Sequence, residues 1–483
     1  HRSHIRCRKA TMSQQQREEL RAAFAVFDAD QSGKLSVDEL VGVMIRPGGG
    51  APVDEAEARA FVTKHDRNGD GELDLEEFTQ AFLDPDGAEA AICSAARAAA
   101  AAAVRAKPIE GFLEKDEVVW DTRGGAALEL ALRVDEELGD SPVRMVDARY
   151  IIELGERGGR LCRRQDLPEE AFVSVEALRR LPKGRGGCLR MMGISHPWQQ
   201  PDNPDPKGIN LRLLARALRS FVEYDGGAPY AVFLDFTSLH QKGPNGEERT
   251  AAEAELFKRA LSDMMVWYAH PKLLTLKLTQ LPAGYPAGFT FPADATPNTA
   301  GYFGRGWCFC ESSVSNMVKD YDFVLDLGKL GPETKGLDAL VKECTAKRDP
   351  PLTPADFRRA LADKAFTSKK ADEETVASLY EATFSKQMGV ATDLRYGRLQ
   401  WGDAEVLQLC KVLASGALDD KLRYLYLNDN QIGDEGAKAL AAVLDGGSLP
   451  KLEDLDLDDN QLSEAGKAAV KAAAEKRSIG CDV

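Results

Sequence analysis

The chain has 483 residues, enough for about three domains of ordinary size. Its apolar content of 43% can build normal cores, while a formal net charge of −15 and a pI near 5.1 argue against nucleic acid as a partner. No run of residues approaches the ~18 apolar positions of a membrane-spanning helix. The cysteines are scattered and odd in number, nine in all, which predicts free thiols in a reducing, cytoplasmic compartment.

The first eleven residues are basic and do not begin with methionine. They carry four Lys or Arg side chains and no acidic one, so they are interpreted as the remnant of a longer chain or of a transit segment. Met12 is an alternative start. A targeting segment is therefore left open beside the cytoplasmic expectation.

Two twelve-residue stretches near the N-terminus arrange oxygen-bearing side chains around a glycine. Ca²⁺ takes six to eight oxygens at about 2.3–2.6 Å, and one short loop can supply them. Gly33 and Gly71 stand where such a loop turns sharply. The residues expected to provide ligands are Asp28, Asp30, Ser32, Lys34, Ser36 and Glu39, and then Asp66, Asn68, Asp70, Glu72, Asp74 and Glu77.

These stretches resemble the calcium loops of the EF-hand family at every diagnostic position. In that pattern Lys34 and Glu72 give only their carbonyls. The resemblance implies an all-α EF-hand pair over residues 12–85 with two Ca²⁺ sites, in which Leu35 and Leu73 join the loops through a short shared strand. The alternative, an acidic turn between solvated helices, is disfavoured by two complete matches in tandem. The second loop holds more carboxylates and is expected to bind more tightly.

Residues 86–186 are expected to form a helical linker region. Its clearest segment is an alanine-rich helix over residues 95–104, which Pro108 terminates.

Short apolar runs alternate with helical stretches from residue 187 to 330. The runs cover residues 188–194, 230–235, 273–278 and 321–327. Such alternation predicts a parallel sheet with helices on both faces. Functional side chains are then expected at the carboxyl ends of the strands.

One motif in this region resembles TIR domains. Trp307 is followed four residues later by Glu311, and the strands come in a similar order. The resemblance implies a flavodoxin-like sheet over residues 187–330. Because some TIR domains cleave the glycosidic bond of NAD⁺ with this glutamate, it also nominates Glu311 as a catalytic residue. The sequence departs from the family after the first strand, at Ser195, and in a long insertion over residues 282–300.

Each polar residue of this region has a structural interpretation as well. Trp307 can fill the core while Glu311 caps a helix or forms a local salt bridge. His196 and His240 follow strands and suit acid–base chemistry, but a histidine that only hydrogen-bonds at a sheet edge is commoner. Asp235 ends a strand and can contact a ligand or cap the next helix.

The C-terminal part contains an internal repeat. Residues 331–398 are expected to be a helical connector, and residues 399–483 a block whose copies are offset by 30 residues, with Asn430 matching Asn460. The block resembles leucine-rich repeats, in which the asparagine hydrogen-bonds backbone within the turn. Because so few repeats are only marginally stable alone, the block is expected to pack on the preceding domain. It either binds a protein partner or serves as a structural cap.

The sequence thus predicts a multidomain protein: an EF-hand pair, a central flavodoxin/TIR-like parallel α/β sheet and a short leucine-rich-repeat block. The first functional hypothesis is a calcium sensor in signalling, a regulatory or scaffold protein whose TIR-like and repeat domains bind protein partners. The alternative is a calcium-regulated enzyme that cleaves NAD⁺ or a related nucleotide. A pocket at Glu311 beside Ser195 and Asp235 would favour the enzyme.

Overall fold

The computed structural model describes Phe24 and residues 32–37, 55–81, 125–180, 183–200, 203–243, 246–280, 300–345, 347–366, 370–419 and 421–483. The chain forms two compact units, residues 1–110 with 168–170 and residues 111–167 with 171–483. Within the described ranges, no helix combines the length and apolar character needed to span a bilayer.

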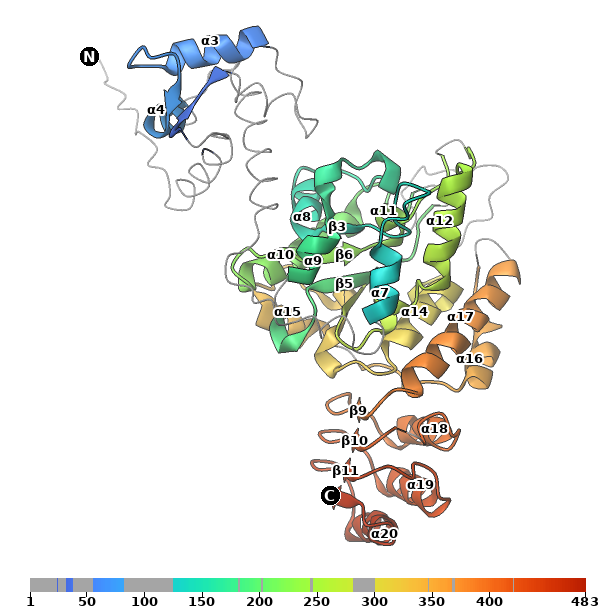
Figure 1. The fold of residues 1–483 in the computed structure, drawn as a ribbon. Helices are drawn as coiled ribbons and strands as arrows, with labels where there is room; N and C mark the ends of the chain where they lie inside the picture. The colour runs from blue at the N-terminus through green and yellow to red at the C-terminus, as the bar shows by residue number, and fades with distance from the viewer. Residues whose placement is uncertain are drawn as a thin grey trace, which may run out of the picture. The chain divides into compact units, whose positions relative to one another are not determined.

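In the N-terminal unit a two-stranded sheet joins the two acidic stretches (Figure 1). β1 (Lys34–Leu35) pairs antiparallel with β2 (Leu73–Asp74), so Leu35 lies opposite Leu73, and both side chains are fully buried. α3 (Glu55–His65) precedes β2 and α4 (Leu75–Ala81) follows it. The structure thus contains the expected short strand between the loops.

A small apolar core supports this pair. The ring of Phe24 meets the ring of Phe78 edge-on, with centroids 5.6 Å apart, and Phe61 is also buried. Met44 and Phe82, apolar residues that follow the first and the second loop in the chain, lie outside the described residues.

The second unit is built on a six-stranded sheet of order β4-β3-β6-β5-β7-β8. Its strands are β3 (Met145–Asp147), β4 (Phe172–Val173), β5 (Met191–Ser195), β6 (Ala231–Phe233), β7 (Leu274–Lys277) and β8 (Val324–Asp326). β6, β5, β7 and β8 are parallel, and their order is that of the first four strands of a flavodoxin-like sheet. All four expected strands are present.

Helices cover both faces of this sheet, as predicted (Figure 1). Alternate residues of β5 enter different cores: Met191 joins the first apolar cluster, and Met192 joins the second. The second cluster also includes side chains of α8 (Ala148–Glu156), α10 (Ile209–Tyr224) and α15 (Leu337–Cys344). The first cluster is packed by α7 (Gly125–Leu132), α12 (Ala251–Ser262), α13 (Val266–Ala269), α14 (Gly306–Ser315), α16 (Pro354–Leu361) and α17 (Lys370–Met388).

Two strands occur where we expected only helices. β3 and β4 lie in the 86–186 region that we interpreted as a helical linker, and β3 pairs antiparallel with β6. Each is only two or three residues long, too short for a period-two pattern, so pairing with the sheet decides their conformation. The short helix α9 (Val175–Arg180) follows β4 in the chain, and another short helix, α11 (Asp235–Ser238), follows β6.

The C-terminal block is a stack of strand–helix repeats. Its strands β9 (Asp393–Arg395), β10 (Tyr424–Tyr426), β11 (Asp454–Asp456) and β12 (Gly480–Asp482) form one parallel sheet. The helices between them are α18 (Asp403–Leu413), α19 (Asp434–Asp445) and α20 (Glu464–Glu475). The sheet begins at β9, within the region that we assigned to the helical connector.

The repeated asparagines hold successive turns together. Asn430 Oδ1 accepts hydrogen bonds from the amides of Leu399 and Trp401, both at 3.0 Å. Its Nδ2 donates to the carbonyl of Tyr396 in the preceding turn at 2.8 Å and to that of Leu427 at 2.9 Å. The expected role of this side chain, bonding backbone inside the turn, is present.

The repeats pack on the sheet domain through a continuous apolar core, as expected. Three aromatic rings stack across this region. The ring centre of Phe357 lies 5.0 Å from that of Phe309 and 3.6 Å from that of Tyr380. Arg348 is buried beside them and donates to the carbonyl of Asp320 at 3.2 Å. Trp401 Nε1 donates in turn to the Arg348 carbonyl at 2.7 Å.

We expect Asn430→Ala to lower the free energy of unfolding by about 2–4 kcal/mol, because it leaves buried amides and carbonyls without partners. Asn460→Ala is the matched control. Asn460 accepts from one amide and is less buried, so its loss should cost about 1–2 kcal/mol. Urea denaturation of both variants measures the difference. Equal losses would contradict a special role for the inner turn.

Candidate functional sites: an acidic loop and the carboxyl edge of the sheet

The second acidic loop is described from end to end. Gly71 has φ +87°, a left-handed conformation that glycine adopts without strain, at the point where the loop turns. Glu77 is 5% exposed and folds back over the loop. Its Oε1 accepts from the amides of Arg67 and Asn68 at 2.8 and 3.2 Å. Its Oε2 accepts from the amide of Asp74 at 3.0 Å.

The other loop carboxylates are also turned toward backbone amides. Asp66 accepts from Gly69 and Gly71 at 2.6 and 2.7 Å, and Asp74 accepts from the amides of Glu76 and Glu77. In the described ranges, no three acidic, histidine or cysteine side chains lie close enough to hold a metal ion.

The donor set of this loop fits Ca²⁺. Four carboxylates, the Asn68 amide oxygen and the Glu72 carbonyl are all hard oxygen donors on one short segment. Lys34 of the first stretch reaches across and pairs with Asp70 at 2.6 Å, and this bond lowers the pKa of Asp70. The two stretches are thus connected by charge as well as by strand pairing.

The first loop is described only in part. Ser32, Lys34 and Ser36 are present, and Gly33 has φ +80°, as the turn requires. Asp28, Asp30 and Glu39 lie outside the described residues.

A second group of polar side chains gathers where the parallel strands end. Ser195 is the last residue of β5, Lys277 of β7 and Asp326 of β8. In register, Ser195 lies beside Lys277, which lies beside Asp326. Because β5 lies between its two successors β6 and β7, the strand order reverses there, and open α/β sheets bind ligands outside such a point.

Glu311 lies at this edge, next to Ser195. Ser195 Oγ donates to Glu311 Oε2 at 2.5 Å and lies equally close to the hydroxyl of Tyr302. Glu311 is 6% exposed; burial, with the Asp235 carboxyl nearby, raises its pKa well above the usual range. Burial therefore disfavours the ionised form of this carboxyl. Within the described residues it has no ion-pair partner, which argues against the local salt bridge.

Asp235 belongs to the same edge. Trp198 Nε1 donates to its Oδ2 at 2.8 Å, and the amide of Phe236 donates to Oδ1 at 2.7 Å. Burial raises the pKa of Asp235 to about 6. It therefore both contacts the first turn of α11 and contributes a titratable group to the edge.

The two candidate histidines have different surroundings. His196 Nε2 lies 2.7 Å from Asn210 Nδ2, and burial with the Arg305 charge lowers the His196 pKa to about 3. His240 instead lies 3.2 Å from Asp140 and 3.5 Å from Glu253. His196 is therefore neutral at pH 7 and cannot act as a general acid from its protonated form.

Trp307 differs from our expectation. It is only partly buried, and its Nε1 donates to Asp372 of α17 at 3.3 Å, whereas Glu311 bonds β5. Trp307 and Glu311 therefore contact different elements, although they lie four residues apart on α14. Side chains four residues apart on a helix still point about 40° away from each other. Because α14 lies between β5 and α17, Glu311 can contact the strand while Trp307 contacts the helix.

The sequence analysis missed Lys277 and the unmet polar atoms of this edge. His196 Nδ1 and Gln199 Nε2 are buried without a hydrogen-bond partner in the described part of the chain. A lysine inside the apolar run 273–278 was the available signal, because a buried strand seldom carries a charge.

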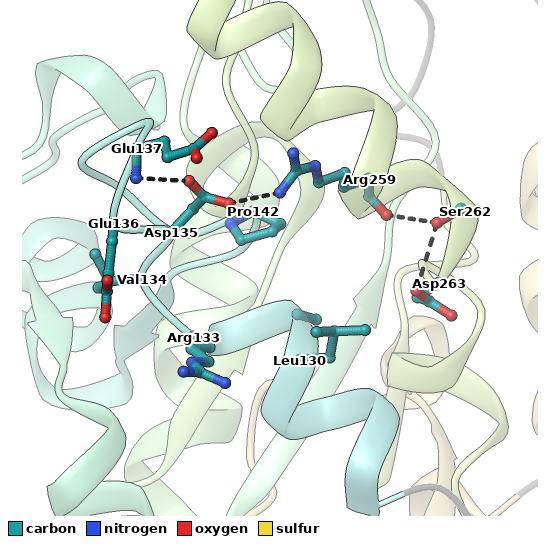
Figure 2. Close-up of a pocket in the computed structure, with 11 residues that line it drawn as sticks. Leu130, Arg133, Val134, Asp135, Glu136, Glu137, Pro142, Arg259, Ser262 and Asp263 are labelled. Carbon is teal, nitrogen blue, oxygen red and sulfur yellow. Dashed lines mark hydrogen bonds and ion pairs between the residues drawn. The ribbon is translucent and has the colours of Figure 1, made fainter.

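A pocket of about 640 Å³ lies elsewhere on the same unit (Figure 2). Leu130 of α7 lines it, and Arg259 of α12 reaches across it to Asp135 at 2.7 Å. None of the sequence-predicted site residues lines this pocket.

Comparison with known proteins supports the assignments made for the N-terminal and C-terminal parts of the chain. Residues 17–83 match the family model of the EF-hand domain pair, and residues 421–441 match that of the leucine rich repeat. Calglandulins of Bothrops insularis and Pseudechis porphyriacus are each 44% identical over 66 residues, which are 14% of this chain. The match covers 41% of each relative's length. The chain therefore contains an EF-hand pair, a calcium-binding domain, and a leucine-rich repeat.

We expect Asp235→Asn to stabilise the protein at pH 7 by on the order of 2–3 kcal/mol and to change little below pH 4. Folding raises this pKa from 3.8 to about 6, so the folded state binds more protons between those values and loses stability as pH rises through them. Asparagine keeps the acceptor for Trp198 without the charge. Urea denaturation at pH 4 and pH 7 measures the effect.

The control is Glu136→Gln, which neutralises an exposed carboxyl and should matter little at either pH. A lower stability of Asp235→Asn at pH 7 would contradict the expectation.

Proposed function

We propose that this chain is a calcium-responsive regulatory or scaffold protein. Its EF-hand pair binds Ca²⁺, and its repeat and sheet domains bind protein partners. The free thiols of the described cysteines support a reducing, cytoplasmic setting. The proposed ligands are Asp28, Asp30, Ser32, Lys34, Ser36 and Glu39 in one loop and Asp66, Asn68, Asp70, Glu72, Asp74 and Glu77 in the other.

The observation that carries the calcium proposal is the pairing of Leu35 with Leu73 between two oxygen-rich loops. It sets the loops side by side, so an ion in one is felt by the other. The Lys34–Asp70 ion pair adds a second connection, because Asp70 is a proposed ligand of the second site. This coupling suits a sensor, whose two sites respond together.

Partner binding by the repeats is supported by the strand residues Tyr424, Tyr426, Asp454, Asp456 and Asp482, each part of the same small parallel sheet. Burial and the charge of Asp482 raise the pKa of Asp454, so a cation brought to these carboxylates relieves their repulsion. The guanidinium of Arg395 already lies 4.8 Å from the Tyr426 ring centre. Such a face suits a partner segment with basic side chains.

Glu77→Gln should lower the affinity for Ca²⁺ at least ~10-fold, since it removes one charged oxygen of the expected bidentate ligand. Glu76→Gln makes the same charge change at an exposed neighbouring position and should leave the affinity nearly unchanged. Calorimetric titration of the full chain with Ca²⁺ compares them. An equal loss in both variants would mean that only net charge matters, and no heat in the wild type would refute the proposal.

A second candidate function is cleavage of NAD⁺ or a related nucleotide at the carboxyl edge of the TIR-like sheet. The observation that favours it is Glu311, which is buried, has no ion-pair partner among the described residues, and is bonded to Ser195 at the strand-order reversal. The unpartnered His196 Nδ1 and Gln199 Nε2 beside this edge leave hydrogen-bonding capacity for a ligand.

The chemistry follows from the electrostatics of Glu311. The positive charge of a bound nicotinamide ring lowers the pKa of this carboxyl and favours its ionised form. The carboxylate then stabilises the oxocarbenium-like centre that forms as the C1′–N bond breaks. The bonding electrons leave with neutral nicotinamide, and water adds to C1′ and releases a proton.

We expect nicotinamide release from NAD⁺ by the full chain with Ca²⁺, and a loss of at least ~100-fold in Glu311→Gln. Glutamine matches the neutral side chain in size and keeps an oxygen to accept from Ser195, so the fold should persist. Chromatographic detection of nicotinamide measures turnover, and a thermal melt checks folding. Equal rates in both proteins would remove Glu311 from catalysis; no release by the wild type would leave a binding module.

A further inference from the structure

Lys277 occupies the centre of the carboxyl edge and has no role in either function proposed above. It ends β7, between Ser195 of β5 and Asp326 of β8 in the sheet register. Its ammonium points to α14, where Nζ lies 3.5 Å from Ser312 Oγ, one residue after Glu311. The lysine therefore lies within the same group of side chains as Ser195 and Glu311.

This ammonium is buried, and none of the described residues provides a counter-ion within ion-pair distance. Lys277 is 3% exposed, and in the described part of the chain the Ser312 contact is its one hydrogen bond, with no carboxylate within 4.0 Å. Asp326 is already bonded by Thr279 and by the amide of Gly328. Burial disfavours the ionised form of Glu311. Burial lowers the Lys277 pKa to about 8, so the cation still predominates at pH 7.

A buried lysine elsewhere in the domain shows what a structural role requires. Lys319 has no exposed surface, but its Nζ donates to the carbonyls of His270 and Leu273, and the first bond is 2.8 Å long. Lys277 has no such carbonyls. An unsatisfied buried charge costs stability, so its position is explained better by an anionic group that arrives with a ligand.

An exposed aromatic ring adjoins this charge. Phe303 follows Tyr302 in the chain, is 48% exposed, and has its ring centre 5.8 Å from Lys277 Nζ. Exposed phenylalanine rings offer a face on which a planar base can stack. A charge for an anion and a face for a ring thus lie side by side.

We propose that Lys277 is the anion-binding residue of this edge and that its ligand is a nucleotide, held by a phosphate on Lys277 and a ring on Phe303. The inference rests on the second proposed function and deepens it, because it names the group that selects phosphorylated ligands. It requires no catalysis.

Calorimetric titration of the full chain with ADP-ribose, adenosine and inorganic phosphate tests it. ADP-ribose has lost the bond to be cleaved, so binding is measured without turnover. The wild type should bind ADP-ribose at least ~100-fold more tightly than adenosine. Lys277→Met should lower the affinity for ADP-ribose at least ~10-fold and leave the affinity for adenosine unchanged. Lys277→Arg should retain part of the affinity, and Phe303→Ala should weaken both nucleosidic ligands. Lys272→Met, at the exposed opposite end of the same strand region, is the control and should bind as the wild type does.

The outcomes separate the two proposals. Lys277→Met should melt at or above the wild-type temperature, because it removes an unpaired buried charge; a large fall would show a structural lysine and overturn the inference. Unchanged ADP-ribose affinity in this variant, or no ADP-ribose binding by the wild type, would also overturn it. Binding of inorganic phosphate as tight as that of ADP-ribose would reject the nucleotide in favour of a free anion. Lys277-dependent binding without nicotinamide release would refute the catalytic function alone.

Discussion

The burial of β5 on both faces is the constraint that organises the central domain. Met191 and Met192 enter separate apolar cores, and a side chain at Gly193 would approach the Trp267 carbonyl to 2.8 Å. Polar groups have no place along such a strand, because burial without partners is costly. They can occur only where the strand ends, and Ser195 is the first of them. The concentration of chemistry at one edge is therefore a consequence of packing.

The difference between local sequence patterns and tertiary contacts explains how much of the structure could be predicted from the sequence. Apolar runs and glycine-centred acidic loops are local signals, and they predicted the parallel strands, the EF-hand pair and the asparagine turns of the repeats. The strands β3 and β4 depend on pairing with distant segments and leave almost no local pattern. The direction of Trp307 and the isolation of Lys277 are likewise tertiary properties, since they depend on which helix and strand lie opposite.

The C-terminal repeats show how a marginal module gains stability from its neighbour. A few repeats bury too little surface to fold alone. Here the core continues from α14 through stacked rings to Trp401, and Arg348 bridges the two parts by donating to the carbonyl of Asp320 while its own carbonyl accepts from Trp401. A buried guanidinium that donates to carbonyls from both terminal nitrogens fixes direction as well as distance. The repeat sheet is thus held in one orientation on the sheet domain.

Carboxylates behave in opposite ways in the two candidate sites, and solvent decides which. In the second acidic loop Asp70 is exposed to water, and the hydrogen bonds that it accepts from Lys34 and from the amide of Glu72 lower its pKa, which favours the charged form that a hard cation needs. At the carboxyl edge Glu311 lies beside hydroxyls in a buried site, and burial raises its pKa and disfavours the charged form. The electrostatics therefore favour Ca²⁺ binding in the loop and do not favour it at the carboxyl edge. A ligand that brings positive charge next to Glu311 and negative charge next to Lys277 would satisfy both groups at once, which neither a metal ion nor a simple anion can do.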